Sequence, residues 1–481
     1  MPCILGVLGI WVLALLLIGL DAGKKINLTG KLHMLIYQLA APHFLLLSWM
    51  ASQYAGKQGV GVFPLILASV PFYFYLVYTF IRLMVFPLQR EESGNFRVRV
   101  MYGGRTVLCA GVLGVLVQAV FYCFAIPWFL KGTLPLWVII ADTVIALLLL
   151  FVVLANGFLR IICTCRRLGA IRRVVIILCV WLPVVNLFLF WYLCRKAAEE
   201  YDHECYKVVS QQLRADSMVC STKYPLLLVH GVGFRDLKYF NYWGRIPKAL
   251  MKNGAQVYYG HQEAWGTVED NARDIGEKIR EIREQTGCQK VNIIAHSKGG
   301  LDARYLISRL GMGEQVASLT TICTPHYGSE LVDVLQKLPP KFYLWLCGVI
   351  NRAFRKVGDK NPDSYSASLQ LSTNFAVQFN RETPDDPRVT YQSYATLMKN
   401  SFSDSLLSIP HFILRRVKGP NDGLVCVDSA KWGVFCGVLS NRHRRGISHG
   451  DIIDLKREDY KGFDVCEFYI GLVSKLKEQG F

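Results

Sequence analysis

The chain has 481 residues, 52% of them hydrophobic, and a formal net charge of +18. This length allows two or three domains, and the apolar content is high for a soluble protein. Residues 1–200 hold 17 Lys and Arg but 6 Asp and Glu, whereas residues 201–481 hold 37 and 30. Cations set between long apolar runs indicate a membrane bilayer as partner. No long basic stripe is interleaved with aromatic residues, so we expect no nucleic-acid partner.

Residues 1–200 are predicted to form an all-α transmembrane domain of five or six helices. Five apolar runs are long enough to cross a hydrocarbon core of about 30 Å. They are Cys3–Leu20, Val60–Ile81, Val107–Leu130, Pro135–Leu159 and Val174–Cys194. His33–Ser52 is a weaker sixth candidate, because it contains Gln38, Pro42 and His43. Asp142 is an acid within a predicted span; we favour a position near the helix start over one that faces a partner.

The Arg-rich loops predict the orientation of this integral, multi-pass protein. Arg residues crowd residues 82–105 and again residues 160–173, and cytoplasmic loops carry such an excess. Six spans would then place the chain after Cys194 outside the cytoplasm, and we favour this extracytoplasmic location. Arg195 and Lys196 argue for the opposite side, which would follow if the last run, broken by Pro183 and Asn186, were re-entrant.

Residues 201–222 are predicted to be a helical linker, and residues 223–481 a separate catalytic domain. Strand and helix patterns alternate there, which favours an α/β fold with a mostly parallel sheet and helices on both faces. The predicted strands are Pro225–His230, Gln256–Tyr259, Val291–Ala295, Ala317–Cys323 and Val389–Tyr394. The predicted helices are Tyr239–Asn253, Thr267–Gly287, Gly299–Leu310 and Asp464–Lys477. Ligands of such a fold bind beyond the carboxyl ends of the strands.

A nucleophile elbow is predicted at Ala295-His296-Ser297-Lys298-Gly299, directly after the third predicted strand. Such an elbow holds a serine on a strained turn between a strand and a helix, with small residues two positions before and after it. Ala295 departs mildly from the usual glycine but meets the steric need. We therefore expect Ser297 to be a nucleophile exposed at the end of the sheet.

The other parts of a serine hydrolase follow in the required order. The amides of Val232, in a glycine loop after the first strand, and of Lys298 are the expected oxyanion donors. Asp422 lies in an Asn-Asp-Gly turn before an apolar run that we expect to be a strand, and His449 lies in a later loop. His449 would take the serine proton and Asp422 would orient it. Asp428 and His443 are the rival candidates.

Taken together, these motifs resemble the α/β-hydrolase lipases of the bacterial triacylglycerol lipase type, from Tyr224 to about Ile453. The resemblance rests on Leu228–Gly231, Val291–Gly300, Thr324–Ser329, Leu369–Thr373, Phe379-Asn380, Asn421–Val425 and His449–Asp451. GPI-inositol deacylase-like hydrolases share several of these motifs. The resemblance implies a serine esterase of acyl-lipid esters with Ser297, Asp422 and His449 as its triad. Residues 1–200 do not match the secreted lipases.

The resemblance also implies a structural calcium ion near the catalytic histidine, although the chemistry itself requires no cofactor. Asp451 matches one ligand position and Asp404 is a plausible second. Between about residues 330 and 378 the chain carries an insertion with an apolar segment, Phe342–Ile350, followed by cations. This segment suits a lid that opens against a lipid interface, and a core helix of a cap subdomain is an equal alternative.

Our main hypothesis is a membrane-anchored serine hydrolase that cleaves lipid or other carboxylic esters through an acyl-enzyme. A membrane-lipid acyltransferase or deacylase is the first alternative, and a non-catalytic membrane scaffold that retains the hydrolase fold is the second.

Overall fold

A computed structural model of the chain describes residues 37–38, 40–59, 61–85, 95–132, 134–214, 218–233, 241–441, 445–457 and 462–481. The chain divides into a helical unit, Met1–Gln212, and a C-terminal unit, Leu213–Phe481. The first predicted span, Cys3–Leu20, and the rival histidine His443 lie outside the described residues.

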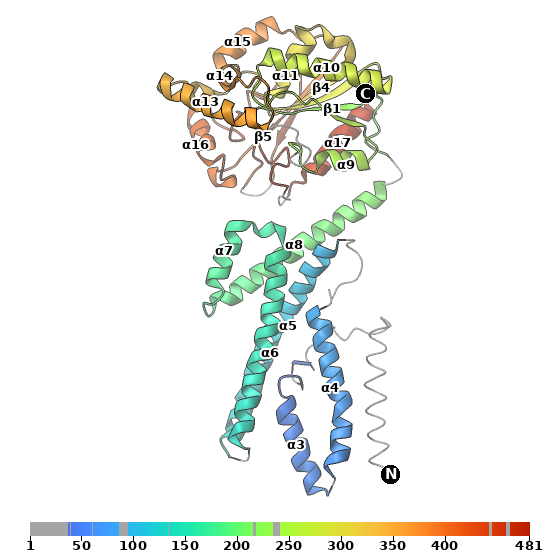
Figure 1. Ribbon diagram of the computed structural model, residues 1–481, viewed down its shortest axis with the longest axis vertical. Helices are drawn as coiled ribbons and strands as arrows, with labels where there is room; N and C mark the ends of the chain where they lie inside the picture. The colour runs from blue at the N-terminus through green and yellow to red at the C-terminus, as the bar shows by residue number, and fades with distance from the viewer. Residues whose placement is uncertain are drawn as a thin grey trace. The chain divides into compact units, whose positions relative to one another are not determined.

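The described residues of the C-terminal unit form one parallel sheet of six strands in the order β2-β1-β3-β4-β5-β6. Helices surround this sheet in Figure 1. The strands are β1 Leu226–Val229, β2 Val257–Tyr259, β3 Val291–His296, β4 Val316–Ile322, β5 Thr390–Thr396 and β6 Val434–Leu439. The α/β fold with a mostly parallel sheet that the alternating pattern predicted is therefore confirmed. The sheet's central strand is flanked on both sides, and every residue of β3 is buried.

Helices cover both faces of this sheet. They are α9 Ile246–Lys252, α10 Val268–Thr286, α11 Gly299–Ser308, α12 Glu330–Leu335, α13 Pro340–Val357, α14 Ser364–Leu369, α15 Thr373–Glu382, α16 Ser408–Val417 and α17 Val465–Glu478. One apolar core joins Leu226 and Leu228 of β1 to α9 and α17. A second core joins Leu227 and Val229 of the same strand to α10 and α11. Because successive strand residues point to opposite faces, four consecutive apolar residues supply both cores.

Helix α10 follows the predicted helix within one residue at each end. Its apolar residues repeat at helical spacing, and four of them lie in the second core. The Thr267 side chain accepts a hydrogen bond from the Asp270 amide at 3.2 Å and caps the first turn. Gly287 ends the helix with a φ of 70°, which a residue without a side chain adopts freely.

Two predictions for the C-terminal unit are wrong. The predicted helix Tyr239–Asn253 is shorter, since α9 begins at Ile246 after a turn. The apolar run after Asp422 forms turns instead of a strand, although Val425 is buried. The sixth strand is β6, an edge strand that alternates between exposed and partly exposed residues. An edge strand of this kind lacks the continuous apolar signal of the central strands.

The helical unit contains α3 Phe44–Lys57, α4 Val62–Val85, α5 Phe96–Phe129, α6 Leu136–Thr164, α7 Ala170–Cys179 and α8 Val185–Arg214. The last two residues of α8 are assigned to the C-terminal unit. Among the described helices, α5 and α6 are long and apolar enough to cross a membrane. The expectation of five or six spans is thus corrected to two candidates in the described chain. Helix α3 has 14 residues and reaches about 21 Å, short of a hydrocarbon core of about 30 Å.

The predicted span Val174–Cys194 is broken in the middle. Helix α7 ends at Cys179 and α8 begins at Val185, with Pro183 in the turn between them and a φ of 66° at Val184. Proline disfavours helical backbone at the preceding residue and lacks an amide donor, so an apolar run with such a residue need not stay one helix. The apolar composition of this stretch therefore does not make a single crossing.

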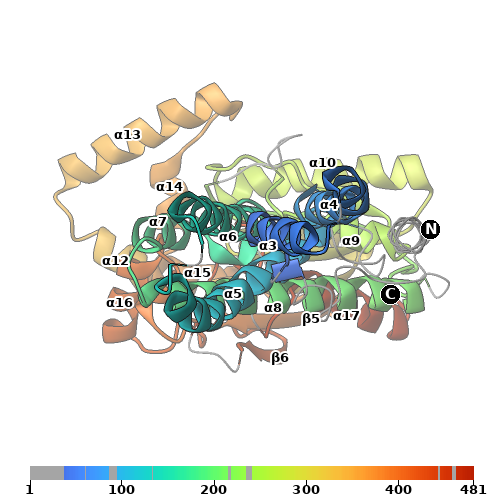
Figure 2. The same ribbon diagram turned by 90° about the horizontal axis from the view of Figure 1, so that it is seen from below.

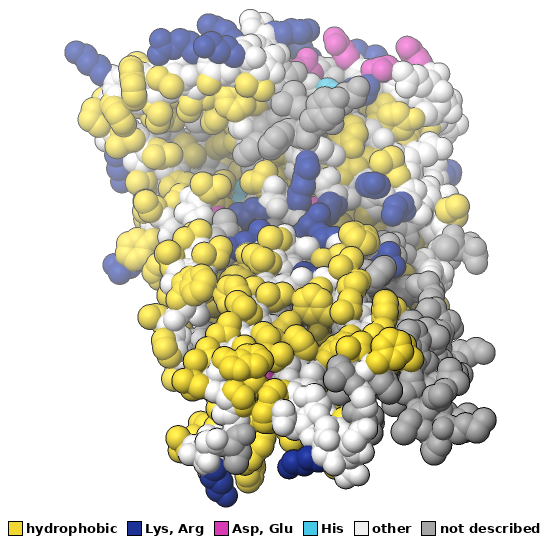
Figure 3. Space-filling view, turned by 60° about the horizontal axis from the view of Figure 1, so that its bottom comes forward, with side chains coloured by type: hydrophobic (Ala, Val, Ile, Leu, Met, Phe, Trp, Pro, Cys, Tyr) yellow, Lys and Arg dark blue, Asp and Glu magenta, His cyan; other side chains and the backbone are white. Residues whose placement is uncertain are grey.

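Glycines let α5 and α6 lie side by side (Figure 1). A Cβ added at Gly157 would lie 2.5 Å from the Leu108 amide nitrogen, and one at Gly104 would lie 2.6 Å from the Arg160 Cβ. Small residues permit such close backbone approach between membrane helices. Large apolar side chains of these two helices, among them Phe124 and Leu147, remain exposed. Hydrophobic side chains cover much of the surface of the helical unit in Figure 3.

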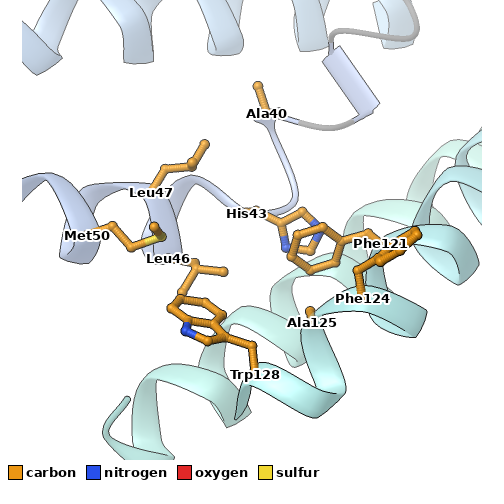
Figure 4. A pocket seen from close by; sticks show the side chains of 9 residues that line it. All are labelled: Ala40, His43, Leu46, Leu47, Met50, Phe121, Phe124, Ala125 and Trp128. Carbon is orange, nitrogen blue, oxygen red and sulfur yellow. The ribbon is translucent and has the colours of Figure 1, made fainter. Parts of the chain in front are cut away.

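Asp142 lies in the second turn of α6, near the helix start as we favoured from the sequence, and it also faces a partner. Its Oδ2 lies 2.7 Å from Nδ1 of His43, and Nε2 of His43 lies 2.8 Å from Oε1 of Gln118. All three side chains are buried. The His43 ring stacks on Phe121 beside an apolar cavity of about 650 Å³ between α3 and α5 (Figure 4).

Candidate active site

Ser297 occupies a strained turn at the end of the central strand. Its φ is 55°, a left-handed conformation that costs a residue with a side chain about 1 kcal/mol. The Ser297 amide donates to the Ile322 carbonyl oxygen at 3.0 Å, which ties the turn to β4. Helix α11 begins two residues later at Gly299. This strand, turn and helix are the local geometry expected of a nucleophile elbow.

The small residues around Ser297 are required by close packing. A Cβ on Gly299 would lie 3.0 Å from the Val229 carbonyl oxygen and closer still to that of His230. A Cβ on Gly231 would lie 2.8 Å from the Ser297 Cβ. Ala295, the other small residue of the motif, is fully buried in β3. The elbow and the loop after β1 therefore meet at the serine.

His449 and Asp422 are bonded to each other twice. His449 Nδ1 lies 2.7 Å from Asp422 Oδ2, and the His449 amide donates to the Asp422 carbonyl oxygen at 2.9 Å. The other carboxylate oxygen of Asp422, Oδ1, accepts from the amides of Leu424 and Val425 at 2.9 and 2.8 Å. The tight Asn-Asp-Gly turn thus fixes the carboxylate, which in turn fixes the imidazole and leaves its Nε2 available.

His296 and Cys323 pack beneath His449. The rings of His296 and His449 are 4.4 Å apart, and His296 Nδ1 lies 2.7 Å from the Tyr242 hydroxyl. Burial lowers the pKa of His296 well below its usual value, and nearby His449 adds to the shift, so His296 is neutral at pH 7. Burial likewise raises the pKa of the Cys323 thiol, with Asp422 adding to it. Both neighbours are therefore uncharged packing partners of His449.

These side chains also bring three possible metal ligands together. Donor atoms of His296, Cys323 and His449 lie within 4.8 Å of one another. A thiol must lose its proton to ligate a metal. Burial opposes that loss at Cys323 when no cation is bound.

The two expected oxyanion donors are available. Lys298 is buried and Val232 is half-buried, and neither amide donates a hydrogen bond to another group among the residues that the structure describes. Val232 follows Gly231, which packs on Ser297. A free amide close to the nucleophile is what an oxyanion requires.

The Lys298 side chain forms a buried ion pair that the sequence analysis missed. Its Nζ lies 2.7 Å from Asp302 Oδ1, and Asp302 Oδ2 accepts from Asn271 Nδ2 at 3.1 Å. Burial raises the pKa of Asp302 to about 6, although Lys298 opposes the shift. The spacing of four residues on a helix was the available signal for this pair. The pair fixes the first turn of α11 directly after Ser297.

The rival acid Asp428 lies outside this arrangement. It is an exposed residue that pairs with Lys431 at 2.6 Å, three positions along the chain. The structure thus brings Asp422 together with His449, whereas Asp428 is a solvated surface residue. The roles of the three triad residues and the two oxyanion donors stay predictions.

The two carboxylates expected to bind calcium do meet beside His449. Ser448 donates its hydroxyl to Asp404 Oδ2 at 2.8 Å and its amide to Asp451 Oδ2 at 3.0 Å. Each carboxylate also holds a protein cation: Lys456 Nζ lies 2.8 Å from Asp404 Oδ2, and Arg445 contacts both oxygens of Asp451 at 2.8 and 3.0 Å.

The remaining oxygen, Asp404 Oδ1, accepts from the Leu406 amide at 3.1 Å. All four carboxylate oxygens therefore have donors already. Calcium needs several free oxygen ligands. The two aspartates as arranged here do not fit the ion, which would have to displace Arg445 and Lys456.

The insertion between residues 330 and 378 forms α12, α13 and α14. Helix α13 turns Tyr343 and Cys347 inward and leaves Phe342, Leu344 and Trp345 at least half exposed. Its far end is held to the loop after β2, because Asp359 accepts from the amides of Ala264 and Trp265 at 3.3 and 3.2 Å. An amphipathic helix with such an outer face is not a fully buried core helix.

Comparisons with known proteins agree with this architecture. Residues 224–413 match the alpha/beta hydrolase fold family. Triacylglycerol lipase 2 of Saccharomyces cerevisiae is 30% identical over 270 residues, which cover 51% of this chain and 78% of the yeast protein. Triacylglycerol lipase of Pseudomonas fragi is 30% identical over 305 residues, which cover 54% of this chain and 98% of the bacterial protein.

Among solved structures, the mature form of Bacillus licheniformis lipase BlEst2 is 23% identical, with a TM-score of 0.41 over 52% of this chain and 92% of that chain. The two sequence matches cover most of each relative and agree with the parallel sheet described above. The chain therefore belongs to the lipase family of α/β hydrolases and is a carboxylic ester hydrolase.

Proposed function

We propose that this chain is a membrane-anchored serine hydrolase of acyl-lipid esters that works through an acyl-enzyme. The single observation that carries the proposal is the pair of hydrogen bonds between His449 and Asp422 in a fold whose central strand ends directly before Ser297. The names of the lipase relatives support a lipid ester as substrate.

The proposed chemistry proceeds in two halves. Ser297 Oγ attacks the ester carbonyl while His449 Nε2 takes its proton, and Asp422 stabilises the resulting imidazolium. The amides of Val232 and Lys298 donate to the oxyanion. The tetrahedral intermediate then expels the alcohol, which receives the proton from His449. In the second half, water gives a proton to His449 and attacks the acyl carbon. The bond from the acyl carbon to Ser297 Oγ then breaks, His449 returns the proton to Oγ, and the carboxylic acid leaves.

A fluorophosphonate probe tests this proposal, because it reacts with an activated serine. We expect the full chain to be labelled and Ser297→Ala to lose the label. Ser474→Ala, which removes a serine on the surface of α17, is the matched control and should be labelled like the wild type. Equal labelling of wild type and Ser297→Ala would contradict the proposal. No labelling of the folded wild type would favour the non-catalytic scaffold.

We further propose that α5 and α6 anchor the chain in a bilayer. Their length, the glycines at their contact and their exposed apolar side chains support this role. The chain should then stay in the membrane fraction at alkaline pH, which releases peripheral proteins. Release into the supernatant would contradict the anchor.

The described contacts favour a cytoplasmic catalytic unit, which reverses the expectation from the loop count. Arg97 at the start of α5 donates to the Thr164 carbonyl oxygen at the end of α6 and to Glu200 of α8, both at 2.5 Å. The Arg-rich ends of both candidate spans therefore lie together, and α8 leaves from that same end. Because Arg-rich ends face the cytoplasm, the chain after α8 should emerge there.

Protease protection tests this orientation. In sealed plasma-membrane vesicles with the cytoplasmic face inward, the C-terminal unit should resist added protease until detergent is added. Digestion without detergent would restore the extracytoplasmic assignment.

A further inference from the structure

Residues 402–416, a short turn followed by α16, expose apolar side chains at the carboxyl edge of the sheet. Phe402 is 94% exposed, Ile409 73% and Phe412 53%. These three side chains line a cavity of about 670 Å³ together with Arg415 and Arg416. A contiguous exposed patch of this kind marks an interaction site more often than chance. We call these five residues the α16 surface.

The α16 surface is held rigidly by the other side of its helix. His411 and Leu414 are buried, and the ring nitrogens of His411 lie 2.9 Å from the Ser401 hydroxyl and 3.2 Å from the Met398 carbonyl oxygen. Asn421, next to the catalytic acid, donates to the His411 carbonyl oxygen at 3.4 Å. The exposed apolar side chains thus stand on a fixed helix that contacts the Asp422 turn.

The two arginines of the α16 surface have no acidic partner among the described residues. Among the described residues, neither Arg415 nor Arg416 forms a salt bridge, although Arg416 lies 4.8 Å above the Phe412 ring. Within residues 399–418 the sequence holds one acid, Asp404, and Lys456 neutralises it. The α16 surface therefore carries a net positive charge directly beside its exposed apolar side chains.

Helix α13 repeats this composition on the same side of the C-terminal unit (Figures 1 and 2). Residues 337–357 hold five Lys and Arg and no acid, and Phe342 and Trp345 are at least half exposed. Both segments follow the carboxyl ends of strands, where Ser297 also lies. One docking event at this edge could engage both.

Charge complementarity identifies the partner. The core of a protein interface is depleted of charged residues. In the α16 surface, by contrast, two arginines lie among the exposed apolar side chains. Long cationic side chains that cover apolar surface and end in charge suit the boundary between lipid headgroups and acyl chains. The inner leaflet facing the cytoplasm is the anionic one.

We propose that the α16 surface docks onto a bilayer that contains anionic lipid, with Phe402, Ile409 and Phe412 inserted and Arg415 and Arg416 against the headgroup phosphates and carboxylates. This docking presents the carboxyl edge of the sheet, and with it Ser297, to the lipid. The inference rests on the proposed place of the chain at a membrane, but not on its ester chemistry.

Photocrosslinking of the full chain tests the proposal. The chain is reconstituted in nanodiscs of phosphatidylcholine, with or without phosphatidylserine, and carries benzoylphenylalanine in place of Ile409. The matched control carries it in place of Val434, which is 64% exposed. Val434 begins β6 and so lies at the amino ends of the strands, away from the carboxyl ends that α16 follows. We expect lipid adducts at position 409, several-fold more with phosphatidylserine, and few at position 434. Equal adduct yields at the two positions, or equal yields with and without phosphatidylserine, would overturn the proposal.

Charge reversal separates electrostatic docking from general membrane contact. Arg415→Glu with Arg416→Glu should reduce adducts at position 409 about tenfold, because each cation near an anionic surface contributes to binding. Arg280→Glu with Arg309→Glu, two exposed arginines elsewhere in this unit, changes the net charge equally and should leave the yield unchanged.

Adducts to a protein at position 409 in intact cells, in place of lipid, would overturn the proposal in favour of a protein partner. Ser297→Ala should retain the lipid adducts. Retained adducts in a chain without esterase activity would therefore leave the docking surface standing while the proposed function fails.

Discussion

His449 donates its amide to the carbonyl oxygen of Asp422 at 2.9 Å and places its Nδ1 2.7 Å from the Asp422 carboxylate. The two residues are 27 positions apart in the chain and return to one point, where backbone and side chain fix the same imidazole. This double connection makes His449 and Asp422 a single rigid element, which leads to the first prediction.

Asp422→Asn should reduce kcat about a thousandfold or more while the fold remains. Asn Oδ1 can still accept from the Leu424 and Val425 amides, so its NH₂ would face His449 and favour the wrong imidazole tautomer. Burst kinetics with a p-nitrophenyl ester measure the acylation rate directly. Asp428→Asn, at the exposed rival position, should act like the wild type; if it is the more damaging change, Asp428 is the acid.

Lys298→Met should lower the free energy of unfolding by about 3 kcal/mol, because it leaves the Asp302 carboxylate buried without its cation. The double variant Lys298→Met with Asp302→Leu removes both charges and should recover much of that loss. Chemical denaturation of the three chains measures the difference. A double variant as unstable as the single one would mean that packing, not charge, sets the cost.

Asp302 also predicts a pH dependence of stability. Its folded pKa of about 6 lies above the ordinary value of 3.8, so between these pH values the folded chain binds a proton that the unfolded chain has lost. The contribution of this group to the free energy of unfolding should therefore fall as pH rises from about 4 to about 6 and be constant above. Asp302→Asn should flatten that slope, and an unchanged slope would assign it to other groups.

Chelators should leave the melting temperature of the wild type unchanged, because Arg445 and Lys456 already neutralise the carboxylates of Asp451 and Asp404. Arg445→Ala with Lys456→Ala should destabilise the chain by about 1–3 kcal/mol, since it leaves buried acceptors unpaired. Added calcium should then restore part of the melting temperature. A wild type that melts earlier with EDTA would show that calcium displaces the two cations.

Gly157→Ala should destabilise the helical unit by about 1–3 kcal/mol, because the new methyl group would meet the Leu108 backbone, which cannot move aside as a side chain can. Gly56→Ala in α3 is the matched control. Nothing lies within 4 Å of its added Cβ, so this substitution should be neutral or slightly stabilising. Thermal unfolding in detergent compares the two, and equal melting temperatures would argue against tight α5–α6 packing.

Local signals explain what could be predicted from the sequence. The apolar run of β3, the small residues around Ser297 and the helical spacing of α10 each act within a few neighbouring residues. The strand and helix pattern therefore predicted the parallel sheet and the position of the elbow. The edge strand β6 gave no comparable signal, because half of its residues meet solvent.

Long-range pairing explains most of what could not be predicted. Lys456 reaches Asp404 across 52 positions, a contact that depends on how the loops after β5 and β6 fold together. The turn between α7 and α8 interrupts an apolar run whose composition alone is that of a single span. Composition records how apolar a stretch is but not whether its backbone stays straight through Pro183.

The φ of 55° at Ser297 has a consequence for any search for sturdier versions of this chain. Glycine adopts that conformation without strain, so thermal selection alone would favour it at this position. The same replacement removes the hydroxyl group. A library screened for heat resistance without an activity assay should therefore enrich inactive chains with Ser297→Gly, and the position of the nucleophile could be found by that enrichment without any knowledge of the substrate.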